Sequence, residues 1–164
     1  MSPLLGIVRP PLLIYGIGNV GRGDDGLGPL LVERLEREGV PPGVALEGGY
    51  QLAPEDALLL SGYDTVLFVD ATKAQDAPAP YSVAPVEPSP ALPFSTHVLD
   101  MGSVLALCGT LYGRAPRAFA LAIPGYEFEV NASLSPGAES NLRRVLEDLH
   151  AALAAVTRSG ARAS

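Results

Sequence analysis

The sequence predicts an α/β fold in which helices cover both faces of a mostly parallel sheet. Short apolar runs typical of buried strands alternate with segments whose apolar residues recur every three or four positions, as in amphipathic helices. Such alternation is typical of parallel sheets with helical crossovers. The 164 residues, 48% of them hydrophobic, suffice for a sizeable core. We therefore expect one domain over residues 1–164.

Five segments are expected to form strands. The segment Thr65–Asp70 is the best candidate for the central strand, because five strand-forming residues are followed by an acid. The segment Tyr81–Val86 is expected at an edge, since prolines such as Pro85 cannot pair on both sides. The other three expected strands are Leu12–Gly16, Val44–Glu47 and Arg117–Ile123.

Four segments are expected to be helical. Gly28 and Pro29 are expected to open a helix that ends before Gly39, since proline suits the first position of a helix. Asp100 is expected to cap a helix over Met101–Leu111. The remaining helices are expected at about Pro54–Ser61 and from Ser135–Pro136 onward, the latter with apolar residues at 138, 142, 145, 149, 152 and 156.

Composition excludes several classes of function. The net charge is −7 and the sequence has no Lys/Arg cluster, so the electrostatic footprint of a nucleic-acid-binding protein is missing. No apolar stretch reaches the roughly 18 residues of a membrane span, and the N-terminus lacks signal-peptide character, so we expect a cytoplasmic protein. Cys108 is alone, which rules out an internal disulfide, and we expect it in the core.

The most informative segment is the glycine-rich loop from Gly18 to Gly28, directly after the first expected strand. Asp24 and Asp25 stand where the next helix should begin. Two carboxylates there would repel a phosphate but attract a metal cation. Helix capping is the alternative role for either aspartate, although one carboxylate would satisfy it.

Ligands of parallel sheets bind beyond the carboxyl ends of the strands, and several acids follow these ends. Asp25, Glu47 and Asp70 each end or follow an expected strand, although Asp70 could equally cap a loop. His97 lies in a loop before a helix and could be structural or merely exposed, whereas His150 lies among ordinary surface residues of the last helix. One imidazole with two carboxylates makes a ligand set suited to nickel, zinc or iron.

Five blocks, in order along the chain, resemble the hydrogenase maturation endopeptidases, which process the large subunit of nickel–iron hydrogenases. The opening block resembles that family's motif G-x-G-N-x-x-x-x-D-[DE]-x-x-G. The blocks are Gly16–Asn19 with Gly23–Gly28, Glu47–Gly49, Phe68–Ala71, Ser95–Leu99 and Ile123–Gly125. The resemblance implies a twisted five-stranded sheet between helices, hence a three-layer sandwich.

The resemblance also implies an activity and a set of site residues. Members of this family remove a C-terminal extension from the large-subunit precursor after nickel insertion. Their metal-contacting and catalytic positions fall on Asp25, Asp70 and His97 in this sequence. The nickel would be presented by precursor thiolates rather than held permanently, and it could polarise the scissile carbonyl or lower the pKa of a bound water.

Neighbouring residues complete the implied site. The segment Glu47-Gly48-Gly49 matches a substrate-recognition loop, in which the family more often has Asp-Gly-Gly followed by Thr or Ser; here Tyr50 follows. Asp25 replaces the Glu of some members. Asp24 and Asn19 are expected to support the ligand residues, Asp24 by capping the helix or by orienting a ligand.

Three rival interpretations remain open at this level. Residues Gly16–Gly21 fit the dinucleotide fingerprint G-x-G-x-x-G, with Glu47 in the place of the ribose-binding acid, which would indicate a non-catalytic nucleotide-binding module. The start Gly16–Asn19 is also similar to that of peptidyl-tRNA hydrolases, whose later motifs are absent. A non-cleaving relative that acts as a chaperone for the large subunit is the third.

Overall fold

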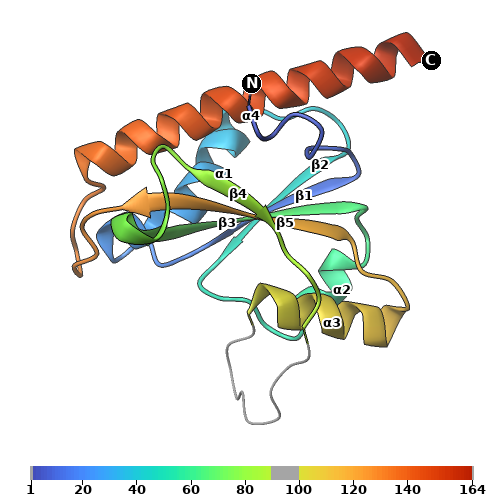
Figure 1. Cartoon of the computed structure of the whole chain (residues 1–164), viewed down its shortest axis with the longest axis horizontal. Coiled ribbons are helices and arrows are strands. Elements are labelled where there is room, and N and C mark those ends of the chain that lie inside the picture. The colour runs from blue at the N-terminus through green and yellow to red at the C-terminus, as the bar shows by residue number, and fades with distance from the viewer. Residues whose placement is uncertain (1, 90–99, 164) are drawn as a thin grey trace.

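The computed structural model describes residues 2–89 and 100–163, and side chains as far as residue 159. In this part of the chain the sheet has the strand order β2-β1-β3-β5-β4 (Figure 1). All neighbouring strands are parallel except β4, which pairs antiparallel with β5. The strands are β1 (Leu12–Ile17), β2 (Val44–Gly49), β3 (Thr65–Lys73), β4 (Ser82–Pro85) and β5 (Arg117–Gly125).

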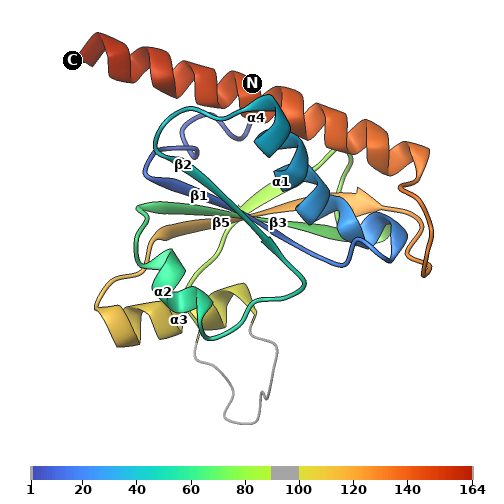
Figure 2. The same ribbon diagram turned by 180° about the vertical axis from the view of Figure 1, so that it is seen from behind.

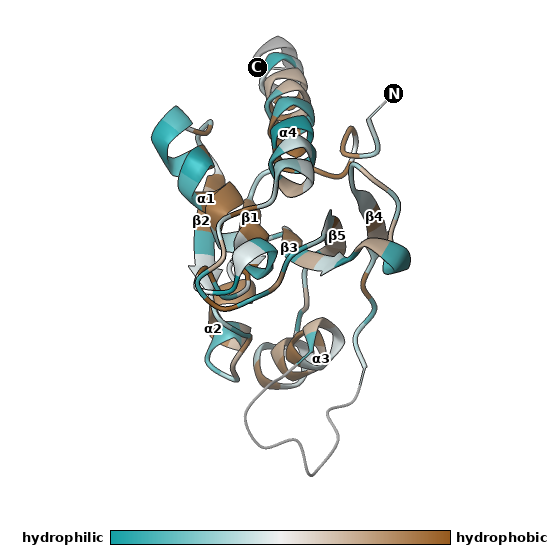
Figure 3. Cartoon of the chain, turned by 90° about the vertical axis from the view of Figure 1, so that its left-hand side faces the viewer, coloured by the Kyte–Doolittle hydropathy of each residue, from teal (hydrophilic) through white to brown (hydrophobic). Residues whose placement is uncertain are grey.

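Helices cover both faces of the sheet, which confirms the predicted three-layer α/β fold. Figures 1 and 2 show α1 and the long α4 on one face and α2 with α3 on the other, and Figure 3 shows the three layers from the side. None of the described helices combines the length and the apolar composition that a membrane span needs. The helices are α1 (Leu27–Glu38), α2 (Asp56–Leu60), α3 (Met101–Tyr112) and α4 (Pro136–Ala163), with short 3-10 turns η1 (Gly23–Gly26) and η2 (Ala74–Asp76).

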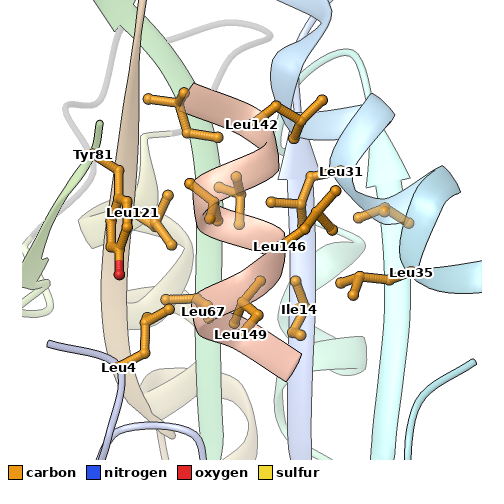
Figure 4. Close-up of a cluster of buried hydrophobic side chains, with 14 of the residues drawn as sticks. Leu4, Ile14, Leu31, Leu35, Leu67, Tyr81, Leu121, Leu142, Leu146 and Leu149 are labelled. Carbon is orange, nitrogen blue, oxygen red and sulfur yellow. The ribbon is translucent and has the colours of Figure 1, made fainter. Parts of the chain in front are cut away.

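Each face of the sheet has its own apolar core. In the larger core, Leu142, Leu146 and Leu149 of α4 pack toward Ile14 and Leu67 of the strands (Figure 4). The smaller core lies under α2 and α3 and contains the fully buried Cys108, as expected for a lone cysteine. The larger core also contains Leu4, so residues near both ends of the sequence contribute to it.

Two element boundaries differ from the sequence-based prediction in ways that matter for the site. Strand β3 continues past Asp70 to Lys73, because β5 also continues and pairs with it as far as Gly125. Asp70 consequently lies within a strand rather than at its end. Helix α1 begins at Leu27 after η1, so Pro29 is its third residue and not its first.

Helix α1 starts in direct contact with the two central strands. A Cβ atom on Gly28 would lie 2.5 Å from the carbonyl oxygens of both Ile17 and Val69. Real Cβ atoms do not approach backbone oxygens so closely, and neither strand can retreat without losing its neighbours. A glycine at this position therefore fixes how near the helix comes to the carboxyl edge of the sheet.

We expect Gly28→Ala to lower the free energy of unfolding by about 3 kcal/mol or more, because the added methyl overpacks two strand backbones. Gly109→Ala is the matched control, since a Cβ on that α3 glycine meets no atom within 4 Å. The control should stabilise the protein by about 0.5–1 kcal/mol through helix propensity. Urea unfolding followed by circular dichroism measures both. A Gly28→Ala protein as stable as wild type would contradict the close approach.

Candidate active site

The loop after β1 folds back so that the Asp25 carboxylate lies over the end of that strand. Gly18 has φ +149°, and a Cβ there would collide with the backbone oxygen of Asp25. The backbone N–H of Asn19 donates to Asp25 Oδ2 at 2.9 Å, and the N–H of Gly21 donates to Asn19 Oδ1 at 2.8 Å. Asn19 thus supports Asp25 through its backbone and the loop through its side chain.

Asp25 is not a helix cap. The N-cap residue of α1 is Gly26, and the structure shows no side-chain capping hydrogen bond at this end of the helix. The capping role considered for Asp25 therefore has no support, and its partly exposed carboxylate is left facing a pocket at the carboxyl edge of the sheet.

Asp70 faces the same pocket from the neighbouring strand β3, in register with Ile17 of β1. Its carboxyl is half-buried, and burial raises its pKa to about 6. A hydrogen bond from the backbone of Ala71 opposes this rise, and the negative charge of Asp25 adds to it. The structure therefore brings together two of the three residues predicted to contact a metal.

The third predicted ligand, His97, lies outside the described residues, so the complete ligand set stays a prediction. Among the residues that the structure does describe, no three His, Cys, Asp or Glu side chains form a group that could hold a metal ion. Two carboxylates alone offer oxygen ligands for a cation and leave the remaining positions to another source.

The pocket has a volume of about 740 Å³ and an acidic lining. Glu87 and Asp100 contribute carboxylates in addition to Asp25 and Asp70, and none of the lining residues in the described part of the chain is Lys or Arg. Asp100 also caps α3, as predicted, by accepting a hydrogen bond of 2.7 Å from the N–H of Ser103. The lining consists of Ile17, Gly18, Asp25, Tyr50, Gln51, Leu52, Asp70, Pro85, Val86, Glu87, Ser89, Asp100, Met101 and Gly102.

Sequence reasoning missed the part of this lining that lies between β4 and α3. Glu87 and Ser89 stand in a proline-rich stretch that carried no motif. The pairing of β4 with β5 and a hydrogen bond of 2.9 Å from the N–H of Ser89 to the carbonyl oxygen of Gly102 bring that stretch to the pocket. The acidic character of Glu87 was the one signal available from sequence.

Asp24 has a different environment from its neighbour Asp25. It is fully buried, and its carboxylate accepts hydrogen bonds from the N–H groups of Tyr126, Glu127 and Ser135 and from the hydroxyl of Ser135, at 2.6–3.0 Å. Burial on its own would raise the pKa of Asp24, but these hydrogen bonds outweigh it and hold the pKa below its ordinary value.

Asp24 therefore ties the loop after β1 to the loop between β5 and α4. Ser135 completes the link, because its hydroxyl oxygen accepts a hydrogen bond from the N–H of Ala138 in the first turn of α4. Asp24 makes no described hydrogen bond to Asp25 or Asp70. Asp24 thus anchors the loop that carries Asp25. It does not cap α1, and it makes no described hydrogen bond that would orient a ligand residue.

The expected recognition segment Glu47-Gly48-Gly49 forms the end of β2 and lies beside the pocket. The carbonyl oxygen of Gly49 accepts a hydrogen bond of 3.0 Å from the N–H of Gly18, which joins this segment to the Asp25 loop. Glu47 and Gly48 are exposed. The next three residues, Tyr50 to Leu52, line the pocket itself.

We expect Asp24→Asn to reduce the free energy of unfolding by about 2–4 kcal/mol, because an amide NH₂ would face donors where an oxygen now accepts. Asp64→Asn is the control, since that exposed carboxylate forms a surface ion pair with Arg114; it should cost less than about 1 kcal/mol. Chemical denaturation of both variants checks the difference. Equal losses would show that the Asp24 network adds no more than a surface pair.

The raised pKa of Asp70 predicts a pH-dependent penalty on stability. The pKa of the Asp70 carboxyl is near 3.8 in the unfolded chain and about 6 in the folded protein, so the folded state binds the proton more tightly. The penalty is absent below both values, grows between them and is complete above the folded pKa. Asp70→Asn should therefore stabilise the fold by about 1–2 kcal/mol at about pH 7.5 and have little effect at about pH 4. Urea unfolding at the two pH values measures this, and a pH-independent difference would contradict it.

Comparison of the structure with solved structures identifies proteins of the same fold. The NiFe hydrogenase maturation protease HycI of Thermococcus kodakarensis KOD1 is similar with a TM-score of 0.72 and 23% identity, over 92% of this chain and 95% of that one. The hydrogenase maturating endopeptidase HybD of E. coli is similar with a TM-score of 0.69 and 24% identity, over 91% and 93%. The hydrogenase 2 maturation peptidase of a Thaumarchaeota archaeon follows with 0.64 and 21%, over 87% and 97%.

Searches of protein-family models and of curated proteins find no match to the sequence. The structural likeness extends over nearly the whole of this chain and of its neighbours. The chain therefore has the fold of the hydrogenase maturation peptidases, the fold that the sequence resemblance predicted.

Proposed function

We propose that this protein is an endopeptidase that removes the C-terminal extension of a nickel–iron hydrogenase large-subunit precursor after nickel insertion. The observation that carries the proposal is the convergence of Asp25 and Asp70 on one acidic pocket, within a fold shared with proteins named as hydrogenase maturation proteases. The cytoplasm, where such a precursor would be assembled, is the proposed location.

In this proposal nickel belongs to the substrate. Asp25, Asp70 and His97 would contact nickel that is already held by thiolates of the precursor, so only loaded precursor would be recognised. Two carboxylates and an imidazole suit that ion, and the pocket presents both carboxylates without a competing cation among its described residues. The ion would supply Lewis-acid polarisation or an activated water at the scissile bond.

Residues of this chain would position the two carboxylates and contact the precursor. The backbone of Asn19 fixes one oxygen of Asp25, so the other oxygen is free to face the pocket. Asp70 is half-buried beside it, and at neutral pH it is ionised despite its raised pKa, so both carboxylates are ready to bind a cation. Glu47, at the exposed end of β2, would contact the precursor beside the pocket and contribute to the choice of substrate.

The alternative of a nucleotide-binding module on Gly16–Gly21 gains no support from the loop. In a dinucleotide site a helix begins directly after the glycines and points its amino end at the phosphates. Here η1 intervenes, α1 begins only at Leu27, and the Asp25 carboxylate lies at the place where an anion would bind.

We expect His97→Ala to lower the rate at which nickel-loaded precursor is cleaved by about a hundredfold or more, because a ligand to the ion is lost. His150→Ala is the matched control, because the only other histidine of the sequence pairs with Glu38 at the exposed junction of α4 and α1. It should cleave like wild type. The readout is the shift in size of the large subunit on a denaturing gel, with circular dichroism to confirm that both variants fold.

Normal cleavage by His97→Ala would contradict the assignment of that residue. A crystal of the protein soaked in nickel or cadmium tests the site independently of activity. Anomalous density between Asp25 and Asp70 would support it, whereas metal bound only elsewhere would count against it.

A further inference from the structure

Strand β2 is an open edge of the sheet. Within the described residues it pairs only with β1, and none of its six residues is fully buried, whereas the first five residues of β1 are. Figure 2 shows β2 at the near border of the sheet. The opposite edge is the short antiparallel β4, which carries Pro85. An unpaired edge strand is a template on which an extended peptide can add as a further strand.

The ladder geometry shows which backbone groups of this edge are available. Residues of a parallel strand bond alternately to the neighbour on one side and on the other. The carbonyls of Gly43 and Gly49 accept hydrogen bonds from the N–H groups of Leu12 and Gly18, at 2.9 and 3.0 Å. Odd-numbered residues of β2 thus bond to β1, so the N–H and C=O groups of Leu46 and Gly48 point outward.

The open edge leads directly into the acidic pocket. Gly18, which bonds to the last residue of β2, lines the pocket together with Asp25. Tyr50, immediately after β2, lines it too and is 69% exposed. A peptide that lies along β2 would therefore enter the pocket at the carboxyl end of that strand.

Gly48 is not required by the packing of this chain. A Cβ there would lie 3.7 Å from the backbone oxygen of Gly16 and 3.9 Å from the Cα of Pro29, which is ordinary van der Waals contact. Its φ is not in the left-handed region. The position can therefore be changed without disturbing β1 or α1, which makes it a suitable place to probe the edge.

We infer that the C-terminal extension of the precursor binds as an added strand on β2, through the outward backbone groups of Leu46 and Gly48. This inference rests on the proposed function. If the substrate-held nickel lies in the pocket, the scissile bond lies near the carboxyl end of β2, and the extension runs from there toward the amino end. The extension would thus pair antiparallel with β2. Main-chain pairing of this kind gives affinity that depends little on the sequence of the extension.

Gly48→Pro tests the pairing, and Gly48→Ala is its matched control. Proline removes the outward N–H and places its ring where the added strand would lie, while the internal ladder loses no donor. Alanine keeps the N–H. With nickel-loaded precursor, Gly48→Pro should raise KM about tenfold or more with kcat little changed, because binding energy common to ground and transition states is lost. Gly48→Ala should raise KM much less than Gly48→Pro, because it keeps the outward N–H.

Hydrogen exchange of the wild-type protein provides a test that does not depend on the proline variant folding. The amides of Leu46 and Gly48 should exchange rapidly in the free protein and become protected when nickel-loaded precursor is added. Exchange that is unchanged in the complex would overturn the inference, as would equal KM values for the two Gly48 variants when both fold. Cleavage by wild type in the same assay separates these results from a failure of the proposed function, in which wild type itself would not cleave.

Discussion

The arrangement of the site depends on one buried carboxylate. Asp24 is fully buried, and burial of a charged carboxylate costs free energy unless hydrogen bonds compensate for it. Four hydrogen bonds from the β5–α4 connection provide this compensation. These bonds join the beginning of the chain to the start of α4, more than a hundred residues later. Because Asp25 follows directly, this network holds the loop in which the Asp25 carboxylate accepts its hydrogen bond from the Asn19 N–H.

The two adjacent aspartates show how far sequence reasoning reaches. The pair in a glycine-rich loop after a buried strand predicts an edge that binds a cation rather than a phosphate, because carboxylates repel an anion, and cation binding stays a prediction. Which aspartate faces the pocket was not readable from the pattern. That depends on a partner, Ser135, contributed by a distant loop, and on the backward turn at Gly18. The resemblance assigned Asp25 to the metal, and the structure places it on the pocket.

The fold class and the order of elements were predictable because the periodicity of apolar residues is a local property. The ends of strands were not, because a strand continues as long as a neighbour offers backbone groups. An example is the pairing of β3 with β5, which continues beyond Asp70 to Lys73. Asp70 therefore lies inside a strand, half-buried, with a raised pKa. Glu87 escaped prediction for a related reason, since its place beside the pocket follows from the pairing of β4.

The walls of the pocket rest on two apolar cores of different size. The loop with Asp25 leads into α1, which is packed in the larger core, while Asp100, Met101 and Gly102 begin α3, which rests on the smaller one. Segments that bury less apolar surface open at a lower free energy than the rest of a domain. Local opening would therefore begin at the α3 wall and leave the carboxylate of Asp25 in place.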